Sequence, residues 1–119
     1  MNRLAAYQEN VVSTQTREKL VVMLYDGAIK FLRQAIPAME AGDVAEKNTL
    51  MQKAQAIIDE LDGSLNMEAG GELADNLRRL YDFLRRDLVL ANIRNDIKRV
   101  RDSIGILEDL NSGWKSIGR

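Results

Sequence analysis

The 119-residue sequence contains no cysteine and no histidine, and it has a single proline. Without cysteine there are no disulfides, thiolate nucleophiles or zinc–thiolate sites. Without histidine the chain lacks the commonest general base at neutral pH and the imidazole ligands of metal sites. Aromatic residues make up only 5% of the chain and are too scattered for a base-stacking platform. These absences argue against an enzyme and leave only carboxylates for acid–base chemistry or for holding a hard cation.

An excess of charge of one sign is also missing. The formal net charge is −1 at pH 7, although 29% of the residues are charged. Basic residues gather in the second half of the chain, but acids alternate with them, as is typical of solvated helix faces with i,i+4 pairs and not of a phosphate track. The N-terminal residues have no apolar core of a signal peptide, and no stretch is apolar enough to span a membrane. We therefore expect a cytoplasmic protein with no nucleic-acid partner and no membrane insertion.

Apolar residues recur at helical spacing through most of the chain, which predicts an all-α fold. The predicted helices span residues 17–41, 44–65, 72–93 and 96–114, within a single domain of residues 1–119 that begins with a mobile segment, 1–15. Asp43 and Glu46 have the spacing of a capping box. Residues 66–71, which include two adjacent glycines, are the one clear predicted loop. Short connections force antiparallel neighbours, so we predict an antiparallel up-down-up-down four-helix bundle with a short N-terminal capping segment.

The first predicted helix is apolar nearly all round between Leu20 and Met39. Such a helix should be covered on more than one side. It is either the central helix of the bundle, or one of its sides stays open for another chain. The open side could close a homodimer, which would make the protein a self-associating structural bundle without a client. Alternatively it could receive an amphipathic segment of a partner.

Carboxylates are the only groups left that could carry chemistry. Asp59, Glu60 and Asp62 cluster at the end of the second predicted helix, and Glu108 and Asp109 lie near the end of the fourth, but none replaces an apolar residue on a helix seam. A di-iron bundle needs Glu-x-x-His motifs, which this chain cannot supply. We therefore predict no catalytic, cofactor-binding or metal-binding residues, and we keep a carboxylate metalloenzyme only as an alternative that metal analysis would test. Asp26, within the apolar first helix, is expected to pair with an arginine, with Arg85, Arg86 and Arg94 as the candidates.

Several ordered stretches resemble one protein family. They are Tyr7-Gln8-Glu9-Asn10, then Glu18-Lys19-Leu20 and Met23–Leu32 in the first half, and Lys53-Ala54-Gln55, Gly70-Gly71-Glu72-Leu73-Ala74, Tyr81-Asp82-Phe83, Ala91-Asn92 and Ile104-x-x-Leu107-x-x-Leu110 with Trp114 further on. Together they resemble the FliS family of flagellin export chaperones. No single piece is diagnostic, but the set keeps its order over nearly the whole chain.

The resemblance implies a cytosolic helical bundle that binds the C-terminal segment of unpolymerised flagellin. That segment is disordered when free and becomes helical on the chaperone. Binding hides a polymerisation surface and delivers flagellin to the flagellar type III export apparatus, with no hydrolysis and no cofactor. Other flagellar regulatory proteins are further candidate partners under the same resemblance.

The resemblance also implies a hydrophobic groove that the N-terminal segment covers until flagellin displaces it. In this chain the cap would consist of Leu4, Tyr7 and Val11, which lie at helical spacing. Our hypothesis for the groove uses apolar residues that lie off the predicted helix seams: Val22, Tyr25, Ile29, Phe83 and Leu90.

Overall fold

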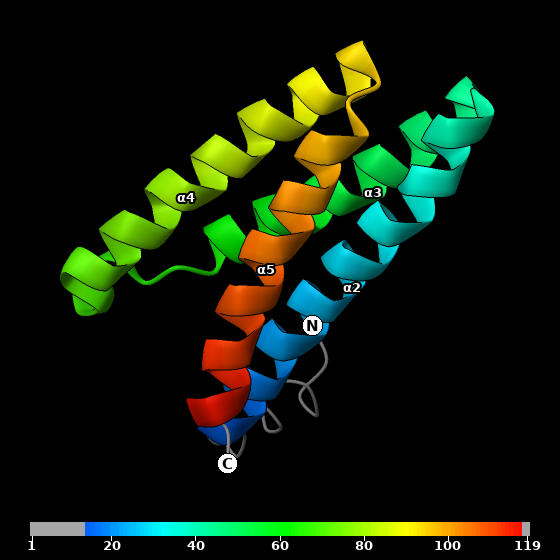
Figure 1. Ribbon diagram of the computed structural model, residues 1–119. Helices are drawn as coiled ribbons and strands as arrows, with labels where there is room; N and C mark the ends of the chain where they lie inside the picture. The colour runs from blue at the N-terminus through cyan, green and yellow to red at the C-terminus, as the bar shows by residue number, and fades with distance from the viewer. Residues whose placement is uncertain (1–13, 118–119) are drawn as a thin grey trace, which may run out of the picture.

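The computed structural model describes residues 14–117, which form four helices (Figure 1). These are α2 (Thr14–Ala41), α3 (Val44–Gly63), α4 (Met67–Arg94) and α5 (Ile97–Ile117). The predicted antiparallel four-helix bundle is confirmed. None of the helices in this range is both long enough and apolar enough to cross a membrane. The predicted cap residues, Leu4, Tyr7 and Val11, lie outside the described residues.

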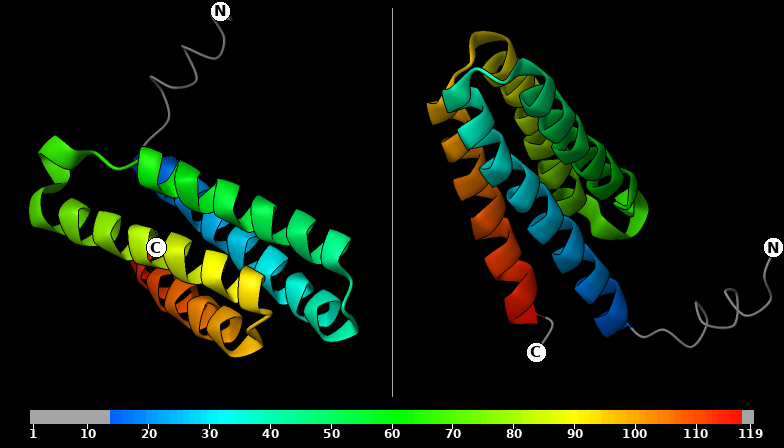
Figure 2. Two further views of the ribbon diagram at one scale, coloured as in Figure 1. Left: turned by 90° about the horizontal axis from the view of Figure 1, so that it is seen from above. Right: turned by 90° about the vertical axis from the view of Figure 1, so that its right-hand side faces the viewer.

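The helices form a ring in chain order. Each one packs on the helix before or after it, and α5 closes the ring against α2, so α2 and α4 lie diagonally opposite each other. The α2–α5 pair and the α3–α4 pair lie together at the end where α2 meets α3 (Figure 2, right). There the amide of Asn95 donates to the carbonyl of Met39 over 3.1 Å. Towards the other end the two pairs diverge, and Leu20 and Met23 in the N-terminal half of α2 are exposed.

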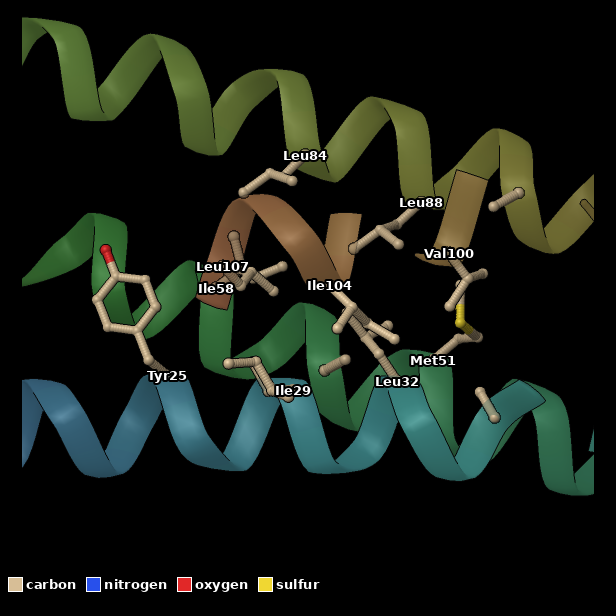
Figure 3. Packing of buried hydrophobic residues seen from close by; sticks show 14 of the residues in the cluster. Tyr25, Ile29, Leu32, Met51, Ile58, Leu84, Leu88, Val100, Ile104 and Leu107 are labelled. Atoms are coloured by element: carbon tan, nitrogen blue, oxygen red, sulfur yellow. The ribbon is translucent and has the colours of Figure 1, made fainter. Parts of the chain in front are cut away.

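One face of each helix fills the core (Figure 3). The buried side chains recur at the three- and four-residue spacing that brings positions onto one side of a helix. They include Tyr25, Ile29 and Leu32 from α2, Met51 and Ile58 from α3, Leu84 and Leu88 from α4, and Val100, Ile104 and Leu107 from α5. The apolar first helix therefore packs on two sides, against α3 and α5, and not on all of them.

Side-chain caps mark the starts of α3, α4 and α5. Asp43 precedes α3 and accepts a hydrogen bond from the backbone N–H of Glu46 over 3.1 Å, as the capping-box spacing predicts. Gly42, just after α2, takes the left-handed conformation with φ of 69°, which glycine adopts without steric cost. Asp96 accepts from the backbone N–H of Arg99 over 3.2 Å at the start of α5.

The loop predicted over residues 66–71 is wrong over most of its length. Asn66 caps α4 by accepting from the backbone N–H of Ala69 over 3.0 Å, and the helix begins at Met67. Gly71 interrupts α4 with φ of 52° and ψ of −129°. The adjacent glycines predict a loop, but the Asn66 cap supports one helical turn before the break at Gly71.

Candidate binding groove

An apolar trough opens where the two helix pairs diverge. It has a volume of about 1000 Å³ and lies between the N-terminal half of α2 and the junction of α3 with α4. Leu20 and Met23 line it and are 54% and 66% exposed. The other lining residues are Arg17, Val21, Leu24, Glu60, Ser64, Leu65, Asn66, Met67 and Glu68. Large apolar side chains exposed in a concave surface are typical of an interaction site.

A second hollow, the deep pocket, adjoins the trough and has a volume of about 300 Å³. The two hollows share the residues Val21, Ser64, Leu65 and Asn66. The deep pocket adds residues from α3, α4 and α5, namely Leu61, Ala69, Gly70, Leu73, Ala74, Leu77, Tyr81 and Trp114. We call the trough and the deep pocket together the groove.

The groove can bind but has little with which to catalyse. Its charged lining residues are Arg17, Glu60 and Glu68, all in the trough, and the deep pocket is lined by apolar and uncharged polar side chains. Within residues 14–117 there is no cluster of three carboxylates that could hold a metal ion. An apolar groove with a charged margin suits the apolar face of an amphipathic segment.

Tyr81, which lines the deep pocket, is hydrogen-bonded to Tyr25 of the core. The hydroxyl groups of Tyr25 and Tyr81 lie 2.5 Å apart and share a hydrogen bond, and both side chains are buried. Burial raises the pKa of Tyr25 and of Tyr81 above the ordinary value, because the phenolate would lose its hydration. The hydrogen bond between the two hydroxyls ties α2 to α4 across the diagonal of the ring.

Ion pairs hold the main part of α4 against α3. The guanidinium of Arg85 lies 3.2 Å from carboxylate oxygens of both Asp59 and Asp62, and it also pairs with Asp82. Arg78, about two helical turns before Arg85, donates to Asp62 over 3.2 Å. The helix that forms one wall of the deep pocket is therefore fixed from Arg78 onward.

The structure does not bring the five predicted groove residues onto one surface. Tyr25 and Ile29 belong to the core, so they are covered in this conformation. Val22 and Leu90 are half-buried on diagonally opposite helices. Phe83 is 45% exposed, but it lies with Ile106 in a hollow between α4 and α5, away from the groove. The physical reason is that an apolar residue outside the main apolar stripe of its helix need not face solvent. It can pack against a second neighbouring helix.

The sequence pattern does not single out the residues that do line the groove. Leu20 belongs to the apolar belt of the first helix, and Met23 lies in the stretch that carries the family resemblance, but no periodicity says which side of a helix stays open. Leu65, Leu73 and Trp114 follow the predicted seams, and only the divergence of the helix pairs turns them towards the groove.

The predicted partner of Asp26 is also wrong. Its carboxylate accepts from the side-chain amide of Asn111 over 2.7 Å and lies 3.7 Å from the ammonium of Lys115. Both partners are on α5, which packs beside α2, whereas Arg85, Arg86 and Arg94 are on the diagonal helix α4.

Taken together, these features define a small helical bundle with an exposed apolar groove. Comparison with known proteins agrees: the chain belongs to the FliS family, since the family model described as "Flagellar protein FliS" matches residues 1–119.

Two relatives are named "Flagellar secretion chaperone FliS". The protein from Bacillus subtilis (strain 168) is 41% identical over 114 residues, which cover 96% of this chain and 84% of the relative. The protein from Salmonella typhimurium (strain LT2) is 40% identical over 110 residues, which cover 92% of this chain and 82% of the relative. These are names of chaperones and not of enzymes, in agreement with the chemistry that the sequence lacks.

A solved structure shows the same fold. The crystal structure of a flagellar chaperone from bacteria superimposes with a TM-score of 0.80, covering 98% of this chain and 97% of the other, at 20% sequence identity.

Proposed function

We propose that this protein is a flagellar secretion chaperone of the cytosol. It binds the disordered C-terminal segment of flagellin in the groove, prevents premature polymerisation, and delivers flagellin to the flagellar type III export apparatus. The observation that carries the proposal is the exposed apolar groove in a member of the FliS family.

The groove fits such a client physically. A disordered segment loses conformational entropy when it binds, so its affinity must come from burying apolar surface. Leu20 and Met23 on α2 and Leu73 on α4 offer that surface, all of them more than half exposed. The flagellin segment would be held through its apolar face, which is the face that must be hidden to prevent polymerisation.

A charge placed in the trough tests this proposal. We expect Met23→Asp to weaken binding of a flagellin C-terminal peptide at least tenfold, because the carboxylate would have to be desolvated against an apolar client. Ile93→Asp is the matched control: Ile93 is 75% exposed on α4 and lies outside the groove, so its replacement should change the affinity less than twofold. Titration calorimetry at several temperatures measures both affinities and should show the negative heat-capacity change of apolar burial.

Two results would contradict the proposal. One is the absence of binding by the unaltered protein at micromolar peptide, and the other is an equal effect of the two substitutions. Sedimentation of the free protein addresses the alternative bundle without a client. A dimer at all concentrations that excludes an apolar dye from the groove would favour that alternative.

The N-terminal cap of Leu4, Tyr7 and Val11 is part of the same proposal. These residues precede α2, and thirteen extended residues reach roughly 40 Å, far enough to return over the trough beside Arg17 and Leu20. Deleting residues 1–12 should raise the affinity for the peptide about two- to tenfold, because the client no longer competes with the cap. Calorimetry measures the affinity, and thermal unfolding should stay cooperative. Loss of cooperative unfolding would instead make the segment part of the core.

A further inference from the structure

We propose that the first turn of α4, residues Met67–Gly70, is a flap that hinges on Gly71 and controls access to the deep pocket. The identity of the client that moves it rests on the function proposed above. The hinge itself rests on the geometry of α4 and on the contacts of its two parts.

The hinge is a break in the helix that only glycine adopts readily. Gly71 has φ of 52° and ψ of −129°, a region that side chains exclude by steric clash. Position 70 beside it also favours glycine, because a Cβ atom there would lie 2.6 Å from the Cβ of Ala74. Two adjacent glycines thus give the backbone a bend with no side chains in the way.

The hydrogen bonds that hold the flap lie within its own turn and its cap. Asn66 accepts from the N–H of Ala69 through its side chain, over 3.0 Å, and from the N–H of Gly70 through its carbonyl, over 2.7 Å. None of the residues 66–71 is buried. Across residues 14–117, no side-chain hydrogen bond or ion pair joins Met67–Gly70 to another helix. The turn can therefore move as a unit without breaking a polar contact to the bundle.

The helix beyond the hinge is fixed. Ala74 and Leu77 are buried, and Arg78 begins the set of ion pairs that holds α4 on α3. The boundary between a loosely held turn and a clamped helix falls at Gly71. A rotation about this glycine would carry the flap while leaving the rest of α4 in place.

The flap lies where such a movement changes the groove. Met67 and Glu68 line the trough, Ala69 and Gly70 line the deep pocket, and Asn66 lines both. The deep pocket, at about 300 Å³, holds only one or two side chains while the flap stays in this position. Displacing the flap widens the opening between the deep pocket and the trough that adjoins it, so that a helical segment of the client can enter both and be covered when the flap returns.

Distance measurements between spin labels test this proposal. The chain has no native cysteine, so labels go only where cysteines are introduced. The flap pair is Lys19→Cys with Glu68→Cys, and the reference pair is Lys19→Cys with Arg79→Cys, which lies on α4 beyond the hinge; all three positions are exposed. We expect a broader distance distribution for the flap pair than for the reference pair in the free protein. Adding the flagellin C-terminal peptide should shift the flap distance by several ångströms and leave the reference distance unchanged.

The hinge substitution Gly71→Ala provides the second measurement. An alanine disfavours the native dihedral angles, so the flap distance in the free protein should move to a different mean while the reference distance stays the same. A flap distribution as narrow as the reference distribution would overturn the proposal, as would bound peptide that leaves the flap distance unchanged. If the unlabelled protein does not bind the peptide, the proposed function fails, and the free-protein distributions still decide whether the flap exists.

Discussion

Replacing Tyr25 by alanine should lower the free energy of unfolding by about 3–5 kcal/mol. The side chain is fully buried between α2 and its neighbours, so its loss leaves a cavity in the core. The hydroxyl of Tyr81 also loses its partner, which adds the cost of an unsatisfied buried donor. Urea unfolding followed by circular dichroism measures the change.

Tyr25→Phe is the control, because it keeps the ring and removes only the hydroxyl. It should cost about 1–3 kcal/mol through the unpaired Tyr81 hydroxyl. If Tyr25→Ala were within about 1 kcal/mol of the unaltered protein while peptide binding collapsed, Tyr25 would belong to the groove after all, as the sequence suggested.

The second large effect concerns alkaline pH. The pKa of both Tyr25 and Tyr81 is raised by burial, so the unfolded chain releases these protons near pH 10 while the native protein still holds them. The stabilising effect of the pair is therefore complete below pH 10 and falls as the pH rises above it. Each tyrosine should contribute a decline of up to about 1.4 kcal/mol per pH unit, until its folded-state pKa is reached.

The double variant Tyr25→Phe with Tyr81→Phe isolates this contribution. It keeps the two rings and every lysine, so deprotonation of the lysines weakens both proteins in the same way. Urea midpoints between pH 8 and pH 11, together with tyrosinate absorbance, should show a shallower decline for the double variant above pH 10. Equal slopes in the two proteins would show that the buried pair does not govern alkaline unfolding.

The secondary structure was largely predictable because it depends on local pattern. The seams of Leu50, Met51 and Ile58, or of Leu84 and Leu88, place one apolar side per helix, and those residues are buried. The Asp43 cap followed from residue types at fixed spacing. In both cases the determinant is a few neighbouring residues, and nothing distant in the chain competes with it.

The candidate site was less predictable because it depends on how helices pair. Lys47 is a charged residue of the second helix, yet it is buried, and its ammonium donates to the carbonyl of Asn92 over 3.0 Å in the last turn of α4. A cation there also meets the negative end of the helix dipole. No pattern within residues 44–65 shows that α4 ends beside Lys47. The same limit applies to Tyr25, whose burial depends on Tyr81 across the ring.

The closure of the ring between α2 and α5 has a consequence for synthesis of the chain. α2 leaves the ribosome first, but the side that meets α5, marked by Asp26 with Asn111 and by Arg33 with Glu108, has no partner until the last helix emerges. Synthesis proceeds at about 5–20 residues per second, so that side of α2 stays without its partner for on the order of ten seconds. During this interval α2, α3 and α4 can pack in order but the ring stays open, so the nascent chaperone exposes more apolar surface than the finished one and itself depends on folding promptly once α5 is released.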